Sequence, residues 1–216
     1  MNAFDLPSFD QLAVFTVASL ALIFTPGPDM TFYLGQTLAG GRAHGFAAML
    51  GAFAGLFVHS MLAALGLSAL LAASAAAFTA LKFLGAIYLL WLAFNAVRHG
   101  SALPLRPGVT SSGSLGRIFK RGLAINLLNP KIVMFFLTFL PQFVAASDPH
   151  AAAKLLFLGL FFIALGVPCC ALLILAAGRL SAVLRRSPRM MRVIDYLFAG
   201  VMGAFAARLL LLSRAP

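Results

Sequence analysis

Pro26, Gly27 and Pro28, followed by Asp29, interrupt a long apolar run near the amino terminus. The run extends from about residue 12 to about residue 38, longer than the roughly 20 residues that cross a bilayer core, so the interruption falls near mid-depth. Proline removes a backbone donor and clashes with the preceding turn, while glycine permits a bend, so a helix is expected to break here. Opened backbone and a carboxylate at that depth need a cavity beside them. The stretch therefore predicts a broken membrane helix beside an ion or substrate path.

The overall composition agrees with a membrane protein. Of 216 residues, 62% are hydrophobic and 10% charged, and the mean hydropathy is +1.01, which leaves too little polar surface for a soluble globule. The formal charge of +11 would suggest nucleic acid in a soluble protein, but most basic residues lie in short connections between apolar spans, so no nucleic-acid partner is expected. Asp5 and Asp10, without Lys or Arg, are unlike the start of a signal peptide, so no cleavage is expected. Only Asp29 among the five acids is expected deep in a span.

Six apolar segments are each long enough to cross a bilayer. They lie at about residues 12–38, 45–72, 77–97, 119–144, 152–177 and 193–212. Eleven basic residues flank the odd-numbered connections: Arg42, Arg98, Arg106, Arg117, Lys120, Arg121, Arg179, Arg185, Arg186, Arg189 and Arg192. The other side carries four: Lys82, Lys154, Arg208 and Arg214. The positive-inside rule then predicts cytoplasmic odd-numbered connections and both termini outside.

The two halves of the chain resemble each other. The fourth span carries its own interruption at Pro130, as the first span does at its prolines. We therefore predict an all-α membrane protein of six transmembrane helices, in which helices 1 and 4 are broken. Residues 1–103 form the first three-helix repeat, 104–117 a flexible cytoplasmic linker and 118–216 the second repeat. Because each half has three spans, the second repeat enters the membrane upside down relative to the first. In transporters built from such inverted repeats, the broken helices meet near the midplane.

Several proline- and glycine-marked motifs follow one another in a specific order. They are FTPGPD at 24–29, GGR at 40–42 with Gly45, LG at 50–51 with Gly55, LKFLGAIYL at 81–89, NLLNPK at 126–131 and PQF at 141–143. In this order the chain resembles the LysE/RhtB family of amino-acid exporters, of the threonine/homoserine/lysine exporter type; after about Val144 it is similar only in hydropathy. The resemblance implies export of amino acids or derivatives across the bacterial inner membrane, driven by the membrane potential or the proton gradient.

Asp29 and Lys131 are the charged candidates for the substrate site. Asp29 begins the second half of span one, where the helix dipole favours an anion. It could bind a substrate ammonium, take up a proton in exchange, or merely cap its half-helix. Lys131 follows Pro130, where the dipole repels a cation, so it needs an anion nearby. Either the two residues pair in the empty state, or a zwitterion inserts between them with its ammonium on Asp29; the alternative is that Lys131 only snorkels to an interface.

Other polar residues lie near the breaks or inside the spans. Four of them are Thr25, Tyr33, Gln36 and Asn126. They either line the path or satisfy opened backbone at the kinks. Asn129 is well placed to cap the half-helix that Pro130 begins, with substrate contact as its second role. His59, near the centre of the second span, could relay protons or pack as a neutral histidine.

Other classes of protein fit the sequence less well. No Walker-type sequence suggests direct use of ATP. The runner-up is an integral-membrane redox or metal-ion transport protein, but the only cysteines, Cys169 and Cys170, are adjacent in one span, and metal-ligand clusters are absent from the sequence. A structural or receptor subunit would have no use for broken helices and buried charges. We expect no catalysis, cofactor or metal.

The sequence restricts substrate and assembly only in part. A single deep acid is less than a dicationic substrate such as arginine would need, so small neutral amino acids are preferred. The many phenylalanines are expected to face lipid. Gly51 and Gly55 form a G-x-x-x-G pair that permits close packing within the chain or between chains, which leaves a homodimer open.

Overall fold

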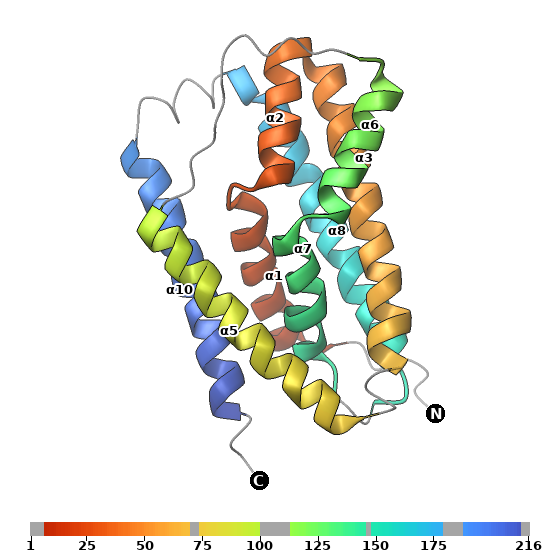
Figure 1. Ribbon diagram of the computed structural model, residues 1–216, viewed down its shortest axis with the longest axis vertical. Coiled ribbons are helices and arrows are strands. Elements are labelled where there is room, and N and C mark those ends of the chain that lie inside the picture. Colours follow the sequence, from red (N-terminus) through yellow and green to blue (C-terminus); the bar gives the residue numbers. More distant parts are fainter. Residues whose placement is uncertain (1–6, 70–73, 100–112, 146–147, 179–187, 213–216) are drawn as a thin grey trace.

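The computed structural model describes residues 7–69, 74–99, 113–145, 148–178 and 188–212, and this part is helical, without strands (Figure 1). The helices in chain order are α1 (Phe9–Phe24), α2 (Pro28–Gly40), α3 (Arg42–Leu62), α5 (Ala75–His99), α6 (Leu115–Leu127), α7 (Pro130–Met134), α8 (Ala151–Leu175) and α10 (Pro188–Leu212). The π-helical turn η1 (Ala63–Leu67) extends α3, and the π-helical turn η2 (Phe135–Phe139) and the 3₁₀ turn η3 (Leu140–Phe143) extend α7.

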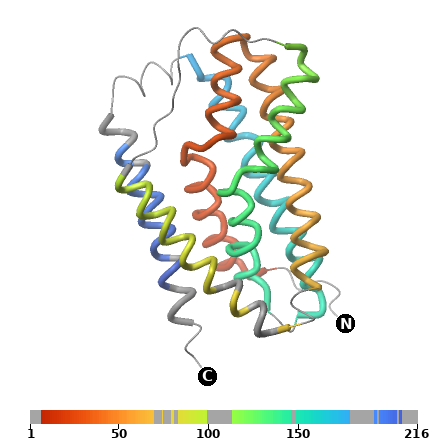
Figure 2. Tube along the Cα trace, in the orientation of Figure 1, coloured from red at the N-terminus to blue at the C-terminus, as the bar shows by residue number. Residues whose placement is uncertain are grey.

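Two helix breaks lie where the sequence predicted them. The axes of α1 and α2 differ by 52°, and those of α6 and the segment Pro130–Phe143 by 50°. Pro28 is the first residue of α2 and Pro130 the first of α7, positions where the missing N–H of proline is no loss. Gly27 precedes α2 in an extended conformation with φ −159° and ψ −178°. Figure 2 shows both breaks at the same height of the molecule.

Helix length and composition support fewer membrane spans than the sequence suggested. Within the described residues, Arg42–Leu67 and Ala151–Leu175 are long and apolar enough to cross a bilayer, and the number rises to four if each bent pair is one span. In α5 the apolar part is shorter, Phe83–Arg98. The predicted spans correspond to helices, but the six-span repeat is not established by these lengths. Residues 104–112 of the predicted linker lie outside the described residues, and α6 already begins at Leu115.

The helices form a bundle with a separate pair at one side. α3 packs against α6, α2 and α8, whereas α5 and α10 pack mainly against each other, on the left of Figure 1. α3 and α6 approach closely because both are glycine-bearing at the contact: a methyl group on Gly51 would overlap the backbone oxygen of Phe119, and one on Gly122 would overlap that of Ala48. The glycine pair of α3 therefore serves packing within the chain.

Two apolar cores lie on either side of the breaks. One, rich in phenylalanine, joins α1, η2 and α8, where the ring of Phe15 lies 5.1 Å from that of Phe143 and Phe135 lies 4.8 Å from Phe162. The other joins α2, α3, α6 and α8 around Leu34. The expectation that phenylalanines face lipid is wrong for these rings, because they fill the space between helices and are almost fully buried. The polar residues of the breaks lie between the two cores.

Candidate substrate cavity between the two helix breaks

Asp29 is held by two asparagines from the other broken segment. Its carboxylate oxygen Oδ2 accepts hydrogen bonds from Asn126 Nδ2 at 2.9 Å and from Asn129 Nδ2 at 2.8 Å. Both asparagines are at least 98% buried, so these bonds form away from water, where they are strongest. The second oxygen, Oδ1, is also buried and has no hydrogen-bond partner within the described residues. One half of the carboxylate is thus fixed and the other half is free to accept a donor.

Lys131 binds the end of α1 rather than Asp29. Its Nζ donates to the carbonyl oxygens of Thr25 at 2.9 Å and Leu22 at 3.4 Å. The last carbonyls of a helix have no intrahelical donor and carry the negative end of its dipole, so the break supplies the anionic partner that Lys131 requires. Asp29 and Lys131 form no direct ion pair, whereas Lys154 pairs with Asp148 in the connection before α8. The ammonium therefore points into the protein, which excludes the snorkelling alternative.

Asn129 has two structural tasks. Its Oδ1 accepts a hydrogen bond from the backbone N–H of Lys131 at 3.0 Å, which caps α7 as the sequence predicted, while its Nδ2 holds Asp29. The backbone oxygen of Asn126 lies 3.4 Å from Nε2 of His59, whose ring is stacked on Phe136. His59 is buried behind Asn126 and does not line the cavity.

The remaining predicted polar residues divide into cavity-lining and remote ones. Thr25 lines the cavity, but its hydroxyl donates to the carbonyl oxygen of Ala21 at 2.7 Å and so satisfies opened backbone. Tyr33 also lines the cavity, and its hydroxyl donates to Cys170 Sγ at 3.5 Å. Gln36 lies outside the cavity lining.

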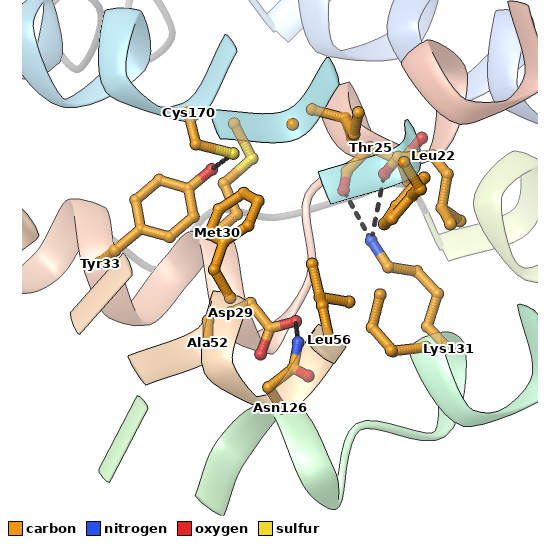
Figure 3. A pocket seen from close by; sticks show the side chains of 15 residues that line it. Leu22, Thr25, Asp29, Met30, Tyr33, Ala52, Leu56, Asn126, Lys131 and Cys170 are labelled. Carbon is orange, nitrogen blue, oxygen red and sulfur yellow. Dashed lines mark hydrogen bonds between the residues drawn. The ribbon is translucent and has the colours of Figure 1, made fainter. Parts of the chain in front are cut away.

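The cavity between the breaks has a polar wall and an apolar wall. Figure 3 shows the carboxylate of Asp29 beside Asn126, and the ammonium of Lys131 turned toward Thr25 and Leu22. Apolar side chains cover the other sides, namely Met30, Phe53, Leu56, Ile132 and Phe162. The cavity volume is about 60 Å³, enough for a few water molecules. An amino acid would have to widen the cavity.

Gly27 makes room for the ammonium of Lys131. A methyl group at Gly27 would lie 2.9 Å from Nζ and 3.2 Å from Cε of that lysine. The extended backbone of Gly27 is open to any residue, so its value here is space rather than conformational freedom. The glycine between the two prolines therefore lets Lys131 reach the carbonyls of α1.

Sequence reasoning missed two features of the interior. Asp195, in α10, is only 1% exposed, so Asp29 is not the only acid inside the bundle as expected. The helical spacing of Asp195 from the buried Phe198 and Met202 on the same helix was the available signal. Cys170 lies in the cavity wall one turn after Gly166; Cys170 contacts Tyr33 of α2, whereas Gly166 lies against Phe53 of α3 and Ile23 of α1. Three metal-ligating side chains do not come together anywhere in the described residues.

An all-helical apolar chain with a buried polar cavity between two helix breaks is built like the helical membrane proteins that carry small solutes. The sequence matches the LysE type translocator family over residues 20–213, and the chain belongs to this family, as its motifs predicted. It is 32% identical over 149 residues to a homoserine/homoserine lactone efflux protein of Salmonella typhimurium (strain LT2), a match that covers 69% of this chain and 72% of the relative. It is 27% identical over 195 residues to a leucine efflux protein of Salmonella choleraesuis (strain SC-B67), covering 90% of this chain and 92% of the relative. No solved structure matches the chain.

Proposed function

We propose that this protein is a secondary active transporter that exports small neutral amino acids, or close derivatives, from the cytoplasm by proton antiport. The observation that carries the proposal is the pairing of a free carboxylate oxygen with a buried ammonium in one cavity: Asp29 Oδ1 has no partner within the described residues, and Lys131 borders the same space. A zwitterion needs one group of each sign.

The unused hydrogen-bonding groups of the two residues match the ammonium and carboxylate groups of an amino acid. The substrate ammonium would donate to Asp29 Oδ1, whose orientation is already set by Asn126 and Asn129. Lys131 has three ammonium hydrogens and bonds two backbone oxygens, which leaves one hydrogen for the substrate carboxylate. The backbone and asparagine bonds would keep both charges in place while the site is empty, so binding needs little rearrangement of the charged groups.

The rest of the cavity favours a neutral substrate side chain. The walls beyond the charged groups are apolar, with Met30, Phe53 and Phe162 among them, and among the described residues no acid besides Asp29 borders the space. The names of the relatives, which are efflux proteins for homoserine or its lactone and for leucine, support the same class. A second cation on the substrate would be buried without a partner, at a cost of several kcal/mol.

Asp29 is also the proposed coupling residue. Proton uptake at Asp29 would remove the charge that holds the substrate ammonium, so protonation and substrate binding would exclude each other. His59, behind Asn126, is the second candidate for proton transfer. It would act from the far side of Asn126, because it does not line the cavity.

The proposed setting is the bacterial inner membrane, with six spans in a 3+3 inverted repeat and both termini in the periplasm. α3 and α6 begin at the top of Figure 1; Arg42 is the first residue of α3 and Arg117 lies in the first turn of α6, with Lys120 and Arg121 in the middle of that helix. Lys154 lies near the start of α8, at the opposite end. α1 begins and α10 ends at that lower end. This asymmetry of charge supports a cytoplasmic upper face.

Counterflow in proteoliposomes tests the proposal. Proteoliposomes that contain the purified protein would be loaded with unlabelled leucine, homoserine, threonine or arginine. Uptake of the same amino acid in labelled form would then be measured, with and without a pH gradient. We expect exchange of the neutral amino acids, loss of at least tenfold in Asp29→Asn and Lys131→Ala, and no change in Asp148→Asn, which removes a charge in the connection before α8. Parental rates in both cavity variants, or exchange of arginine alone, would overturn the proposal.

A further inference from the structure

A second hollow lies at the upper end of the molecule, between α2 and α8. It is an open cleft of about 690 Å³, and six of its lining residues are Thr37, Gly41, Arg42, Ile174, Leu175 and Ala177. Arg42, the first residue of α3, reaches across it and donates from Nη2 to the backbone oxygen of Leu175 at 3.3 Å. The cleft therefore opens at the same end of the bundle as the basic helix ends.

The cleft and the cavity between the breaks both border one seam between two helices. On α2, Asp29 and Tyr33 line the cavity and Thr37, one turn further, lines the cleft. On α8, Gly166 and Cys170 line the cavity and Ile174, again one turn further, lines the cleft. These residues recur every four positions, so each set forms one stripe of its helix. The two hollows therefore lie one after the other along the same two stripes.

A thin layer of side chains separates the two hollows. On the side of the cavity, the layer consists of Tyr33 and Cys170, which are joined by the hydrogen bond from Tyr33 Oη to Cys170 Sγ, 3.5 Å long. On the side of the cleft, the layer consists of Thr37 and Ile174, which both lie next to Gly45 of α3. A methyl group on Gly45 would collide with Thr37 and lie 3.2 Å from Cγ2 of Ile174. The Tyr33, Thr37, Cys170 and Ile174 side chains are all buried, so the layer is shut.

The layer is weakly held for a buried contact. Thiol sulfur is a weak acceptor, so the bond from Tyr33 costs less to break than an ordinary hydrogen bond. The hydroxyl of Thr37 is satisfied within its own helix, by the backbone oxygen of Tyr33 at 2.7 Å, and needs no partner across the seam. Separation of α2 from α8 here would release the Tyr33 hydroxyl, and water that enters from the cleft would then accept its hydrogen bond.

We propose that the seam between α2 and α8 is the substrate path from the cytoplasmic cleft to the cavity, and that Tyr33 and Cys170 form its gate. The identity of the substrate rests on the proposed function, but the path itself is a claim about which face of the membrane reaches Cys170. Opening of this gate would both connect the cavity to the cleft and supply the additional volume that an amino acid requires.

Thiol labelling tests the path without any transport measurement. The sequence contains two cysteines, so Cys169→Ser leaves Cys170 as the only thiol. A charged, membrane-impermeant methanethiosulfonate reagent would be applied to right-side-out and inside-out membrane vesicles. Ser114→Cys, in a background without both native cysteines, marks the face at which α6 begins. We expect Cys170 to react at least tenfold faster from the face that labels Ser114→Cys than from the opposite face.

Two further variants make the test specific to the gate. Tyr33→Phe keeps the ring but removes the hydroxyl, and it should raise the labelling rate of Cys170 severalfold. Cys170→Ser retains Cys169, which lines neither hollow, and its labelling rate is the background to be subtracted. Labelling of Cys170 from the opposite face, equal labelling from both faces, or an unchanged rate in Tyr33→Phe would overturn the gate. Asp29→Asn should keep the sidedness even where counterflow is lost, which separates failure of the path from failure of the binding site.

Discussion

The ammonium nitrogen of Lys131 lies 2.9 Å from the backbone oxygen of Thr25, so the start of one broken helix is fixed to the end of another. Asp29 makes the reciprocal connection, because it begins α2 and is held by asparagines at the end of α6 and the start of α7. The two breaks therefore satisfy each other's exposed groups. The two charged groups border one cavity without forming an ion pair, and the proposed zwitterionic substrate would bind both.

Replacement of Lys131 by methionine should damage both the fold and the transport. The change keeps an unbranched side chain that is one atom shorter, but it leaves the oxygens of Thr25 and Leu22 without their donor. A hydrogen bond to a charged group contributes about 1.5–3 kcal/mol, which corresponds to a roughly ten- to hundredfold loss of substrate affinity. Affinity would be measured by the concentration of leucine or homoserine that half-saturates counterflow. Lys154→Met, near the start of α8, is the matched control, and an equal effect in both variants would contradict the role of Lys131.

A methyl group at Gly27 should displace the ammonium of Lys131. In Gly27→Ala the new carbon would lie 2.9 Å from Nζ, closer than side chains tolerate, and the lysine is the group that can move. We expect weaker binding of amino acids but nearly parental binding of amines that lack the carboxylate, since the contact to Asp29 persists. Competition of both kinds of compound against labelled leucine would measure the difference. Gly35→Ala, on the same helix with open space around it, should bind like the parent.

The sequence was sufficient to place the breaks, but it did not determine what the charged groups contact. Prolines 26, 28 and 130 act through local backbone chemistry, so their effect can be read from neighbouring residues alone. The partner of Asp29 depends on how α2 and α6 are rotated about their axes. Of the two alternatives that the sequence left open, a direct pair with Lys131 is absent and Asn126 and Asn129 hold Asp29 instead, while a substrate between the two charges stays a prediction. Substrate contact by these residues stays a prediction.

Apolar residues of a membrane protein pose a similar difficulty. Lipid and protein interior are equally apolar, so hydropathy does not tell whether a ring such as Phe15 faces helices or lipid. The same ambiguity hid Asp195, because a polar residue near the end of a span can face either water or a neighbouring helix. Glycine was more informative: the predicted close approach at Gly51 is present, and the structure adds that the partner is α6 of the same chain.

The connection before α8 should show a small dependence of stability on pH. Asp148 accepts hydrogen bonds from Lys154 Nζ at 2.5 Å and from the backbone nitrogen of His150 at 2.8 Å, and these donors hold the pKa of its carboxyl below the ordinary value. A folded pKa below the unfolded one stabilises the protein above the unfolded value of about 3.9, and the gain is lost as the pH falls through the folded pKa. Asp148→Asn should therefore lower the free energy of unfolding at pH 7 by less than about 1 kcal/mol, and the melting temperature should fall slightly. Melting curves in detergent from pH 7 to pH 3 should converge, and a constant difference would be inconsistent with the ion pair.

The contact between α3 and α6 should be the most sensitive to added volume. In Gly122→Ala the new methyl group would overlap the backbone oxygen of Ala48, and backbone on both sides cannot move without separating the helices. Overpacking of this kind costs about 1–3 kcal/mol, so the melting temperature in detergent should fall by several degrees. Because Asn126 follows Gly122 by one turn and holds Asp29, transport should fall as well. Gly116→Ala is the control on the same helix, where a methyl group meets no other atom and the gain in helix propensity is at most about 1 kcal/mol. A Gly122→Ala protein that melts and transports like Gly116→Ala would mean that the two helices do not approach each other this closely.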